Sequence, residues 1–591
     1  MRMWHDEPVR RRADAMHVDT IRSHQKAADG TVREYRSHLL RHSFRDEQGR
    51  PRKETLANLT ALPDAALEAV RKALRGEVMV SADEAFEVER SVPHGDAAAA
   101  HVMASALGLR DLLGPACRER DIAYALILSR AIRPESKLST VTWWAAGDTT
   151  IGADLGVAGA SADEVYAAMD WLESRQRQIE KKLAARHLAP GGIAMFDLSS
   201  SWVEGSCCEL AAFGHSRDGK RGRRQIEYGL LTDPQGRPVA VEVFAGNTAD
   251  PVSFKTAITR VRGDFGIKNL IMVGDRGMIT GTRIDDLREM PGMDWITSLR
   301  APAVAALAAD DGPLQMSLFD VHDFAEISHP DYPGERLVCC YNPALAAERE
   351  RKRQALLAAT EADLEKIAAS AAAGRLKDPD KIGIRAGKAL GKHKVAKHFI
   401  TEITGTSFTW RRDQEQIAAE AALDGIYVIR ASVNRDLLSP AGLITAYKNL
   451  KYVERDFRIT KADDLDLRPI YHYLQQRVRG HVLICMLACY LTWHLRAALA
   501  ALTFTDPDIP VPASPVAPAQ RSPQARNKDA AKRNSDNLPV RKYGDLLSHL
   551  STLTRQTITF AGQPIEKLTN PTPVQRRAFE LLGTPVPLTL K

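Results

Sequence analysis

Cysteine is scarce in this chain of 591 residues and follows no metal-binding pattern. The seven cysteines are an odd number, two pairs are vicinal, and no Cys-x-x-Cys occurs. These spacings exclude a disulfide framework and a zinc finger, and they are typical of a reducing compartment. Cys485 and Cys489 stand one helical turn apart among aliphatic neighbours. That setting predicts two buried thiols on a core helix rather than a metal site.

The chain also lacks a long uninterrupted apolar run. Its most apolar stretch, residues 482–502, contains His494 and Arg496, and its first residues show no apolar segment of a signal peptide. We therefore expect a soluble, cytoplasmic protein with no membrane partner. An HExxH helix is absent too, and the acidic residues considered below are placed for a metal rather than for the acid and base of a glycosidase.

What is present is the composition of a globular protein with a mild excess of positive charge. Hydrophobic residues make up 44% and charged residues 26%, the formal net charge is +7, and the sequence pI is about 8.9. At roughly 150 residues per domain, this length predicts about four domains. The basic bias is compatible with a nucleic-acid partner without requiring one.

The N-terminal third divides into a basic head and a helical region. Residues 1–78 predict a small β-rich head in which strand-like runs at 35–44 and 52–56 flank a turn. Such a head suits DNA contact, and an ordinary hairpin with solvated charges is an equal alternative. Residues 79–190 predict helices, and Ser161 with Glu164 forms a capping-box pattern before apolar residues at helical spacing.

The middle of the chain predicts an α/β core in two parts. Residues 191–300 give the order β-β-β-α-β-α-β, with strands or helices expected at 193–197, 225–231, 239–244, 251–262, 270–273, 284–290 and 295–299. After an interruption, residues 425–505 resume with a strand at 425–430 and a helix that begins at Ser439 and Pro440.

Two further segments lie outside this core pattern. Residues 301–424 predict an insertion domain that is partly helical and rich in Arg and Lys. Residues 506–591 begin with a Pro- and Ala-rich stretch, which predicts a flexible linker and a weakly ordered C-terminal tail.

Two acidic residues follow predicted strands of the core. Asp197 ends the strand expected at 193–197, and Asp275 stands just after the strand at 270–273. Strand ends present side chains to a crevice, so the two carboxylates are candidates for one site. Each Asp taken alone is equally compatible with capping a strand-to-helix turn.

The helix after Ser439 supplies a third acidic residue. At about 100° per residue, Tyr447, Leu450, Glu454 and Lys461 fall within a stripe roughly 60° wide. A helix that packs this stripe inward buries a carboxylate and an ammonium, which are almost never buried unless they are paired or liganded. The alternative is that Glu454 and Lys461 extend to solvent from the edge of the stripe.

Phosphodiester chemistry explains this set of residues. Three carboxylates can hold two Mg²⁺ ions, with Mn²⁺ as a substitute, because Mg²⁺ prefers oxygen ligands and keeps several waters. Two such ions activate a water and stabilise the leaving oxygen. Lys461 and the hydroxyl of Tyr447 are then placed to hold a DNA phosphate.

The same residues resemble a known signature. The segment from Tyr447 through Glu454 to Lys461 is similar to the Tyr-(2)-Arg-(3)-Glu-(6)-Lys pattern of the DDE transposases of bacterial insertion sequences. Leu450 stands where that pattern has Arg, with Lys451 beside it. Residues 244–250, 273–278, 468–471 and 477–481 resemble further motifs of this family in the expected order, and the second of them includes Arg276. The resemblance covers about residues 190 to 500.

The resemblance implies an RNase H-like catalytic core interrupted by the insertion, with an N-terminal DNA-binding head. It implies that Asp197, Asp275 and Glu454 bind the metal ions and catalyse cleavage at the element's terminal inverted repeats, followed by strand transfer into target DNA. Tyr447, Lys451, Lys461 and Arg276 are the predicted DNA contacts. A homodimer on DNA and a hairpin intermediate are also implied.

Two other functions remain open at this point. One is an RNase H-like nuclease that cleaves without strand transfer, which the Tyr/Glu/Lys stripe and the insertion disfavour. The other is a non-enzymatic DNA-binding protein derived from a transposase, which three retained acidic residues disfavour.

Overall fold

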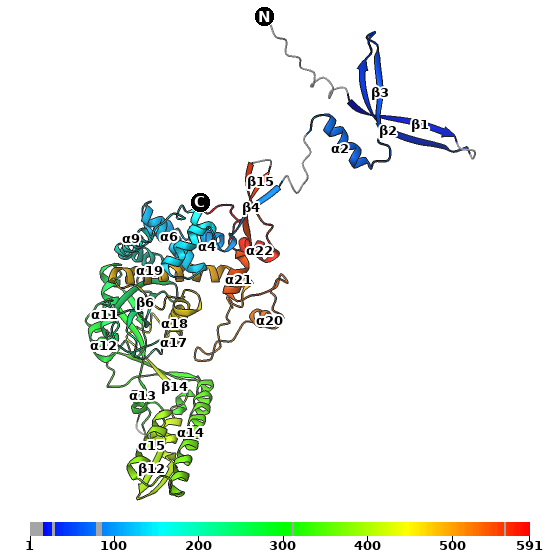
Figure 1. The fold of residues 1–591 in the computed structure, drawn as a ribbon. Coiled ribbons are helices and arrows are strands. Elements are labelled where there is room, and N and C mark those ends of the chain that lie inside the picture. Colours follow the sequence, from blue (N-terminus) through cyan, green and yellow to red (C-terminus); the bar gives the residue numbers. More distant parts are fainter. Residues whose placement is uncertain (1–15, 27–29, 78–85, 310–311, 561–562) are drawn as a thin grey trace. The chain divides into compact units, whose positions relative to one another are not determined.

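The structure, a computed structural model, describes residues 16–26, 30–77, 86–309, 312–560 and 563–591 (Figure 1). Part of the predicted head, residues 1–15, 27–29 and 78, lies outside the described residues. The chain forms two compact units. One comprises residues 1–91 with 556–567, and the other comprises residues 92–555 with 568–591.

The first unit contains a three-stranded antiparallel sheet and most of a second three-stranded sheet. In one, β2 (Val32–Arg45) lies between β1 (Met16–Lys26) and β3 (Pro51–Asn58), and helix α2 (Asp64–Leu74) follows. The Asp46 carboxylate accepts hydrogen bonds from the backbone N–H groups of Gln48 and Arg50, which closes the β2–β3 turn. The predicted pair of strands around this turn is therefore confirmed. The other sheet has the order β16-β15-β4. Its strands are β4 (Phe86–Pro93), β15 (Thr554–Phe560) and β16 (Gln563–Leu568).

Residues 95–187 form helices, as the sequence predicts, whereas residues 86–93 of the range predicted as helical form strand β4 instead. These helices are α4 (Gly95–Ala106), α5 (Leu109–Leu113), α6 (Arg118–Ile132), α7 (Lys137–Ala146), α8 (Thr150–Asp154), α9 (Ala162–Ser174) and α10 (Gln176–His187). The capping box at the start of α9 is confirmed, because the Ser161 and Glu164 side chains each accept a hydrogen bond from the other residue's backbone N–H.

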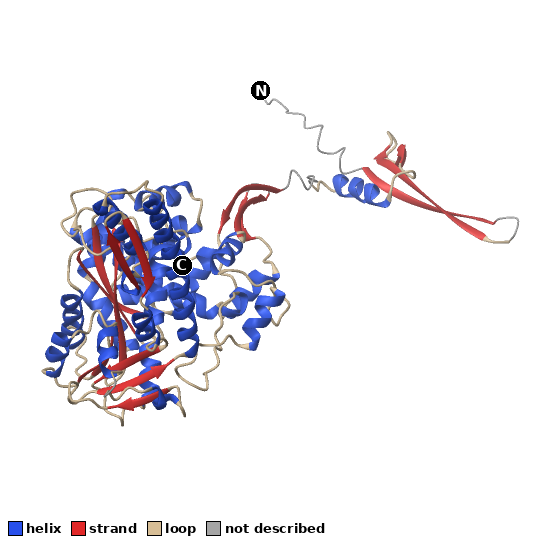
Figure 2. Cartoon of the chain, turned by 90° about the horizontal axis from the view of Figure 1, so that it is seen from below, coloured by secondary structure: helices blue, strands red, loops and turns tan. Residues whose placement is uncertain are grey.

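An eight-stranded sheet of order β10-β11-β14-β9-β8-β5-β6-β7 follows, with helices around it (Figure 2). Strands β5, β6 and β7 are antiparallel neighbours, whereas β8 lies between β5 and β9 and pairs in parallel with both. The predicted element order is confirmed by β5 (Ile193–Trp202), β6 (Gln225–Thr232), β7 (Pro238–Ala245), α11 (Asp250–Gly263), β8 (Leu270–Val273), α12 (Gly281–Arg288) and β9 (Met293–Ser298).

The region predicted as an insertion contributes partly to this sheet. After α13 (Ala301–Leu307) and a short 3-10 turn (Met316–Phe319), strands β10 (Phe324–Ile327) and β11 (Arg336–Tyr341) extend the sheet next to β14 (Ile426–Ala431). The residues that follow β11 pack around a hydrophobic cluster of their own, which includes Leu357, Leu364 and Phe408. Their elements are α14 (Pro343–Ala372), α15 (Pro379–Lys392), a 3-10 turn (Ala396–His398), β12 (Phe399–Thr404), β13 (Ser407–Arg412) and α16 (Gln414–Ala421).

Helices complete the second unit after β14. They are α17 (Pro440–Lys448), α18 (Leu450–Arg458), a π-helical turn (Ile459–Asp463), α19 (Gln475–Ala498), a 3-10 turn (Ala500–Leu502), α20 (Pro523–Ala531), α21 (Tyr543–Ser551) and α22 (Pro573–Leu581). The prediction of a flexible linker and a weakly ordered tail after residue 505 is wrong. Leu546, Leu550, Val574 and Phe579 are buried in the main core, and this burial holds the segment in place.

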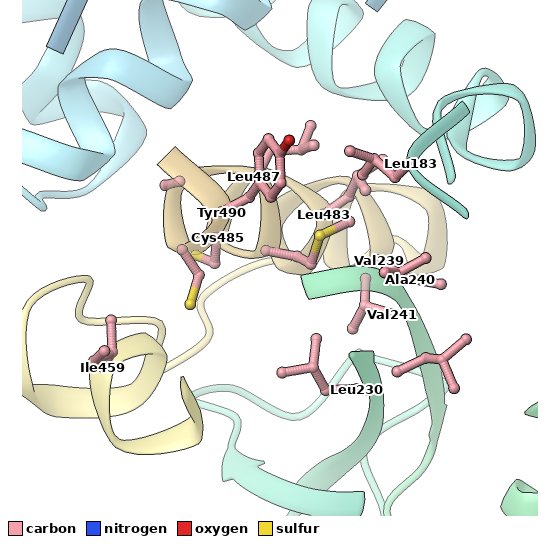
Figure 3. Packing of buried hydrophobic residues seen from close by; sticks show 14 of the residues in the cluster. Leu183, Leu230, Val239, Ala240, Val241, Ile459, Leu483, Cys485, Leu487 and Tyr490 are labelled. Atoms are coloured by element: carbon pink, nitrogen blue, oxygen red, sulfur yellow. The ribbon is translucent and has the colours of Figure 1, made fainter. Parts of the chain in front are cut away.

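Helix α19 lies at the centre of the main core. Figure 3 shows its Leu483 and Leu487 between Leu183 of α10 and the apolar residues of β7, Val239 and Val241. Among the described residues, α19 is the one helix long and apolar enough to cross a membrane, but 83% of its most apolar window is buried inside the protein. This burial is typical of the central helix of a folded domain.

Thiol reactivity tests this packing. Cys485 and Cys489 are buried on α19, as predicted, and Cys208, Cys339 and Cys340 are buried as well. Burial raises the pKa of the Cys339 and Cys340 thiols to about 12, which removes the reactive thiolate. We expect exposed Cys207 to react first with a thiol reagent, half-exposed Cys117 next, and the five buried thiols only after unfolding.

The measurement is the number of modified thiols in native and denatured protein, with each site located by peptide mass spectrometry. A Cys207→Ser variant is the control and should lose the fast phase. Rapid labelling of Cys485 in the native protein would contradict the placement of α19 in the core.

Candidate active site

Asp197 lies in the middle of β5, not at its end as the sequence predicts. The strand continues to Trp202 because residues 198–202 pair with β6, and three consecutive serines are buried in that pairing. The carboxylate accepts a hydrogen bond of 2.8 Å from the backbone N–H of Leu198. Asp197 is half-buried, so one side of its carboxylate is held by the strand while solvent reaches the other.

The register of two parallel strands brings Asp275 to the same level. Met195 of β5 is paired with Val273 of β8. Asp197 lies two residues after Met195, and Asp275 lies two residues after Val273. Side chains two residues apart in an extended chain point to the same face of the sheet. Asp275 also opens the next turn, because its carbonyl accepts hydrogen bonds from Met278 and Ile279. The two acidic residues therefore lie near each other, Asp197 within β5 and Asp275 just beyond the end of β8.

Glu454 completes the group from the other side. It lies on α18, which packs against β5, and it is exposed. Asp197, Asp275 and Glu454 all line one pocket of about 420 Å³. Tyr447, Leu450 and Lys451 line the same pocket. The structure thus brings together three carboxylates that come from β5, from the turn after β8, and from a helix far along the chain.

The electrostatics of the pocket reflect this convergence. The pKa of Asp197 is raised to about 7, chiefly by burial and in smaller part by the negative charges of Asp275 and Glu454. The N–H of Leu198 and the guanidinium of Arg217 act in the opposite direction. Three mutually repelling carboxylates around one hollow create a field that favours a cation.

The donor set fits a hard divalent cation. The carboxylates supply oxygen ligands, which Mg²⁺ prefers, and no thiol or imidazole lines the pocket. Among the described residues, no three His, Cys, Asp or Glu side chains lie close enough together to hold a metal ion as they stand. Repulsion between carboxylates opposes their closer approach until a cation neutralises them. The lining therefore has the right chemistry, with the carboxylates set apart around the hollow.

Tyr447 borders the carboxylates and is held by the sheet. Its hydroxyl lies 2.7 Å from the Ser298 hydroxyl at the end of β9. Burial raises the Tyr447 pKa, and the charges of Asp275 and Glu454 add to the shift. Tyr447 also lines a neighbouring hollow of about 320 Å³ together with Asp275 and Arg276. A neutral phenol is thus kept at the junction of two hollows.

Exposed cations lie beside both hollows. Arg276 is exposed next to Asp275, and Lys451 is exposed on α18 with its ammonium 5.0 Å from the centre of the Tyr452 ring. Arg349 of α14 lines the hollow with Arg276. Arg349 was not predicted as a site residue, because it belongs to a run of charged residues, 349–353, that is equally explained by solvent-exposed helix faces. Its neighbours Arg351 and Lys352 do pair with Glu348, so the run itself gives no signal for Arg349.

Lys461 departs from the predicted stripe. The single helix expected after Ser439 is divided at Asn449 into α17 and α18, and its last turn widens into a π-helix at residues 459–463. A π turn changes the rotation per residue, so Lys461 leaves the line of Tyr447 and Glu454. Its ammonium is buried and lies 2.6 Å from Asp218 Oδ1, and the Arg468 guanidinium lies 2.6 Å from the same oxygen.

The C-terminal segment reaches the edge of the pocket. Lys448, which lines it, donates hydrogen bonds of 2.6–3.0 Å to the carbonyl oxygens of Pro515, Val516 and Ala517. Asn342, also in the lining, donates to the Val516 carbonyl at 3.3 Å. The stretch predicted as a linker is therefore fastened beside the three acidic residues.

Comparison with known proteins adds two family matches. A family model described as "Transposase DDE domain" matches residues 203–491, and one described as "IS1634 family transposase, N-terminal domain" matches residues 21–84. No curated protein matches. A solved structure similar to this chain is a cryo-EM structure of the piggyBac transposase synaptic complex with hairpin DNA. It is 9% identical, with a TM-score of 0.32, over 64% of this chain and 67% of that one.

Proposed function

The chain belongs to the DDE transposases of insertion sequences, and we propose that Asp197, Asp275 and Glu454 are the acidic residues with which it cuts and joins DNA. As a DNA transposase it is an enzyme that binds DNA and uses divalent metal ions. The observation that carries the assignment of residues is their convergence on one pocket from three separate elements. The order β-β-β-α-β-α-β around them supports an RNase H-like core.

We further propose that the three carboxylates hold two Mg²⁺ ions, with Mn²⁺ able to replace them. The ions would lower the pKa of an attacking water and stabilise the leaving oxygen. The protein's own contribution is to set the carboxylates around one hollow and to keep Asp197 ready to ionise fully when a cation arrives. The oxygen-only lining and the shared negative field support this assignment.

We propose that the cations beside the pocket bind the phosphates of the DNA strand. Arg276 and Lys451 are exposed on either side of the acidic residues and can bind phosphates without losing an existing carboxylate partner among the described residues. Tyr447 can donate its hydroxyl to a phosphate in exchange for its bond to Ser298. Lys461 remains a proposed DNA contact, but its ammonium must separate from Asp218 before it can bind a phosphate.

The wider assembly follows from the family. We propose that the basic β1–β3 sheet and the helical region recognise the terminal inverted repeats, that two copies act together on paired ends, and that the protein works in the cytoplasm without a membrane partner. Basic residues on β1, β2 and β3, including Arg22, Arg33, Arg45 and Lys53, support DNA contact by this sheet.

The decisive experiment follows a labelled DNA that carries the element's own end, incubated with the full chain, Mg²⁺ and target DNA. Joined products establish strand transfer. Cleavage without joining would instead favour an RNase H-like nuclease, and tight binding with no product would favour a non-enzymatic DNA-binding protein.

Metal removal gives a separate prediction. Chelation with EDTA should abolish cleavage and joining, and added Mg²⁺ or Mn²⁺ should restore both, because the divalent ions would supply the activated water and stabilise the leaving oxygen. The readout is product formation against metal concentration. Binding of the DNA end, measured by gel shift in EDTA, is the control for a folded protein. Full activity in EDTA would contradict the metal assignment.

A further inference from the structure

A separate hollow, of about 680 Å³, lies between the helical region and residues 466–481, which follow α18. Its lining includes the cations Arg130, Lys137 and Arg468 and the rings of Tyr166, Tyr471 and His472. None of these residues lines the pocket of the three acidic residues. A volume of this size falls in the range of roughly 300–1,000 Å³ typical of small-ligand sites, so it suits one nucleotide and excludes a duplex.

Two of the cations are buried without a carboxylate. Arg130 and Lys137 are each 5% exposed, and among the described residues neither has an acidic side chain within salt-bridge distance. Arg130 instead donates to the carbonyl oxygens of Leu465 and Glu135, at 3.2 and 2.7 Å. The Lys137 ammonium lies 3.1 Å from Nδ1 of His481. Buried charges are normally paired, whereas these two basic groups have no carboxylate in direct contact.

The basic groups also destabilise one another's charged forms. Burial lowers the pKa of Lys137 well below its usual value, and the charge of Arg130 lowers it further. Burial lowers the pKa of His472 to about 3, with contributions from Lys137, Arg477 and Arg130. The acidic residues in the lining, Glu135 and Asp466, are more exposed than the two cations, and Glu135 is already paired with Arg133. An entering anion would relieve this repulsion.

Aromatic rings stand next to the cations. Tyr471 is 67% exposed at the hollow, so most of its ring is accessible to a ligand. Tyr166 and His472 meet edge to face with their centres 6.1 Å apart, and Arg477 covers the Tyr166 ring at 4.4 Å. Cations interleaved with available rings are the features that bind a phosphate and stack a base.

We propose that this hollow binds one unpaired nucleotide of a DNA strand, with its phosphate on Lys137 and Arg130 and its base on Tyr471. Arg468 connects the site to the catalytic helix, since it shares Asp218 with Lys461. The assignment rests on the DNA-binding function of the chain and is independent of the three acidic residues, which lie in a different pocket.

The test uses the full chain and a short single-stranded oligonucleotide with a central 2-aminopurine, in EDTA. Stacking on Tyr471 should quench the fluorescent base, and Tyr471→Ala should remove the quenching and weaken binding roughly tenfold. Lys137→Met should lower the slope of log K against log salt by about 0.7, the loss of one phosphate contact. Thermal melting shows whether buried Lys137→Met still folds, and exposed Tyr471→Ala tests the site even if it does not.

Tyr473→Ala is the matched control, because Tyr473 is 57% exposed two residues away and does not line the hollow. Glu289→Gln, whose side chain lines neither hollow, should also bind like the unchanged protein. Equal losses in the two tyrosine variants, or unchanged binding in Tyr471→Ala, would overturn the proposal. A change in the salt slope without any effect of Tyr471→Ala would reduce the site to a phosphate contact and would overturn its nucleotide assignment.

Discussion

Glu454→Gln is expected to abolish cleavage and strand transfer, with both rates falling by at least about a thousandfold. Glutamine keeps the shape of the side chain but removes the charge that would hold a divalent cation. Glu454 is exposed on α18, so its replacement leaves no buried group unpaired and the fold should be unchanged. The measurement is product formation on the labelled element end in Mg²⁺, with a gel shift to show that DNA binding is retained.

Two comparisons make this result specific. Asp197→Asn and Asp275→Asn should behave like Glu454→Gln, because all three carboxylates line the same pocket. Glu289→Gln is the matched control, since Glu289 is exposed at the end of α12 and lies outside that pocket. If Glu454→Gln retained more than a tenth of the activity, Glu454 would not be a metal ligand, whatever the fate of the other two variants.

Asp218→Asn should have the largest effect on stability. The Asp218 carboxylate is 2% exposed and binds both Lys461 and Arg468 through one oxygen. Removing its charge leaves two cations facing each other in a largely buried place, and breaking a buried pair in this way costs about 3–5 kcal/mol. We expect the first unfolding transition of the chain to move to a clearly lower denaturant concentration. Circular dichroism and intrinsic fluorescence against urea measure this shift, and a chain of two units calls for midpoints rather than a single free energy.

The control for Asp218 is an ion pair at the surface. Glu348→Gln removes the partner of Arg351 and Lys352 on the exposed face of α14 and should leave the unfolding midpoint unchanged. Lys461→Met offers a second comparison, because it removes one of the two cations and leaves Asp218 paired with Arg468. It should destabilise the chain less than Asp218→Asn. The opposite order would show that the carboxylate is not the centre of this cluster.

Several elements could be predicted because their signals are local. The capping box at Ser161, the Asp46 and Asp233 turns and the Ser439 cap each depend on hydrogen bonds between residues at most four positions apart. The helix boundaries near residues 161 and 439 and the β6–β7 hairpin were therefore predictable. Asp197 was predicted at the end of its strand but lies in the middle, because the pairing of residues 198–202 with β6 overrides their polar sequence.

The C-terminal segment shows where composition misleads. A Pro- and Ala-rich stretch predicts a linker, but Val516 is fully buried and its carbonyl accepts from Lys448. Few residues carry that attachment, so the average composition of the segment hides it. Arg349 was not predicted for a related reason. It faces a hollow that other elements build, and nothing in its own run of charged residues indicates this.

The sequence by itself determined which chemical groups this protein has available. Three acidic residues, two of them after apolar runs and one on an amphipathic helix, predicted a metal-dependent chemistry. The resemblance of residues 447–461 and of further motifs to a known signature predicted the family, because motif spacing and strand and helix periodicity are local properties of the sequence. Only the tertiary structure decided which of these groups meet. Met195 pairing with Val273 sets Asp197 beside Asp275, and Lys461 finds Asp218 at a separation of 243 residues. A buried charge takes whichever partner the packed chain brings within reach, and that choice depends on strand register and helix geometry rather than on distance along the sequence.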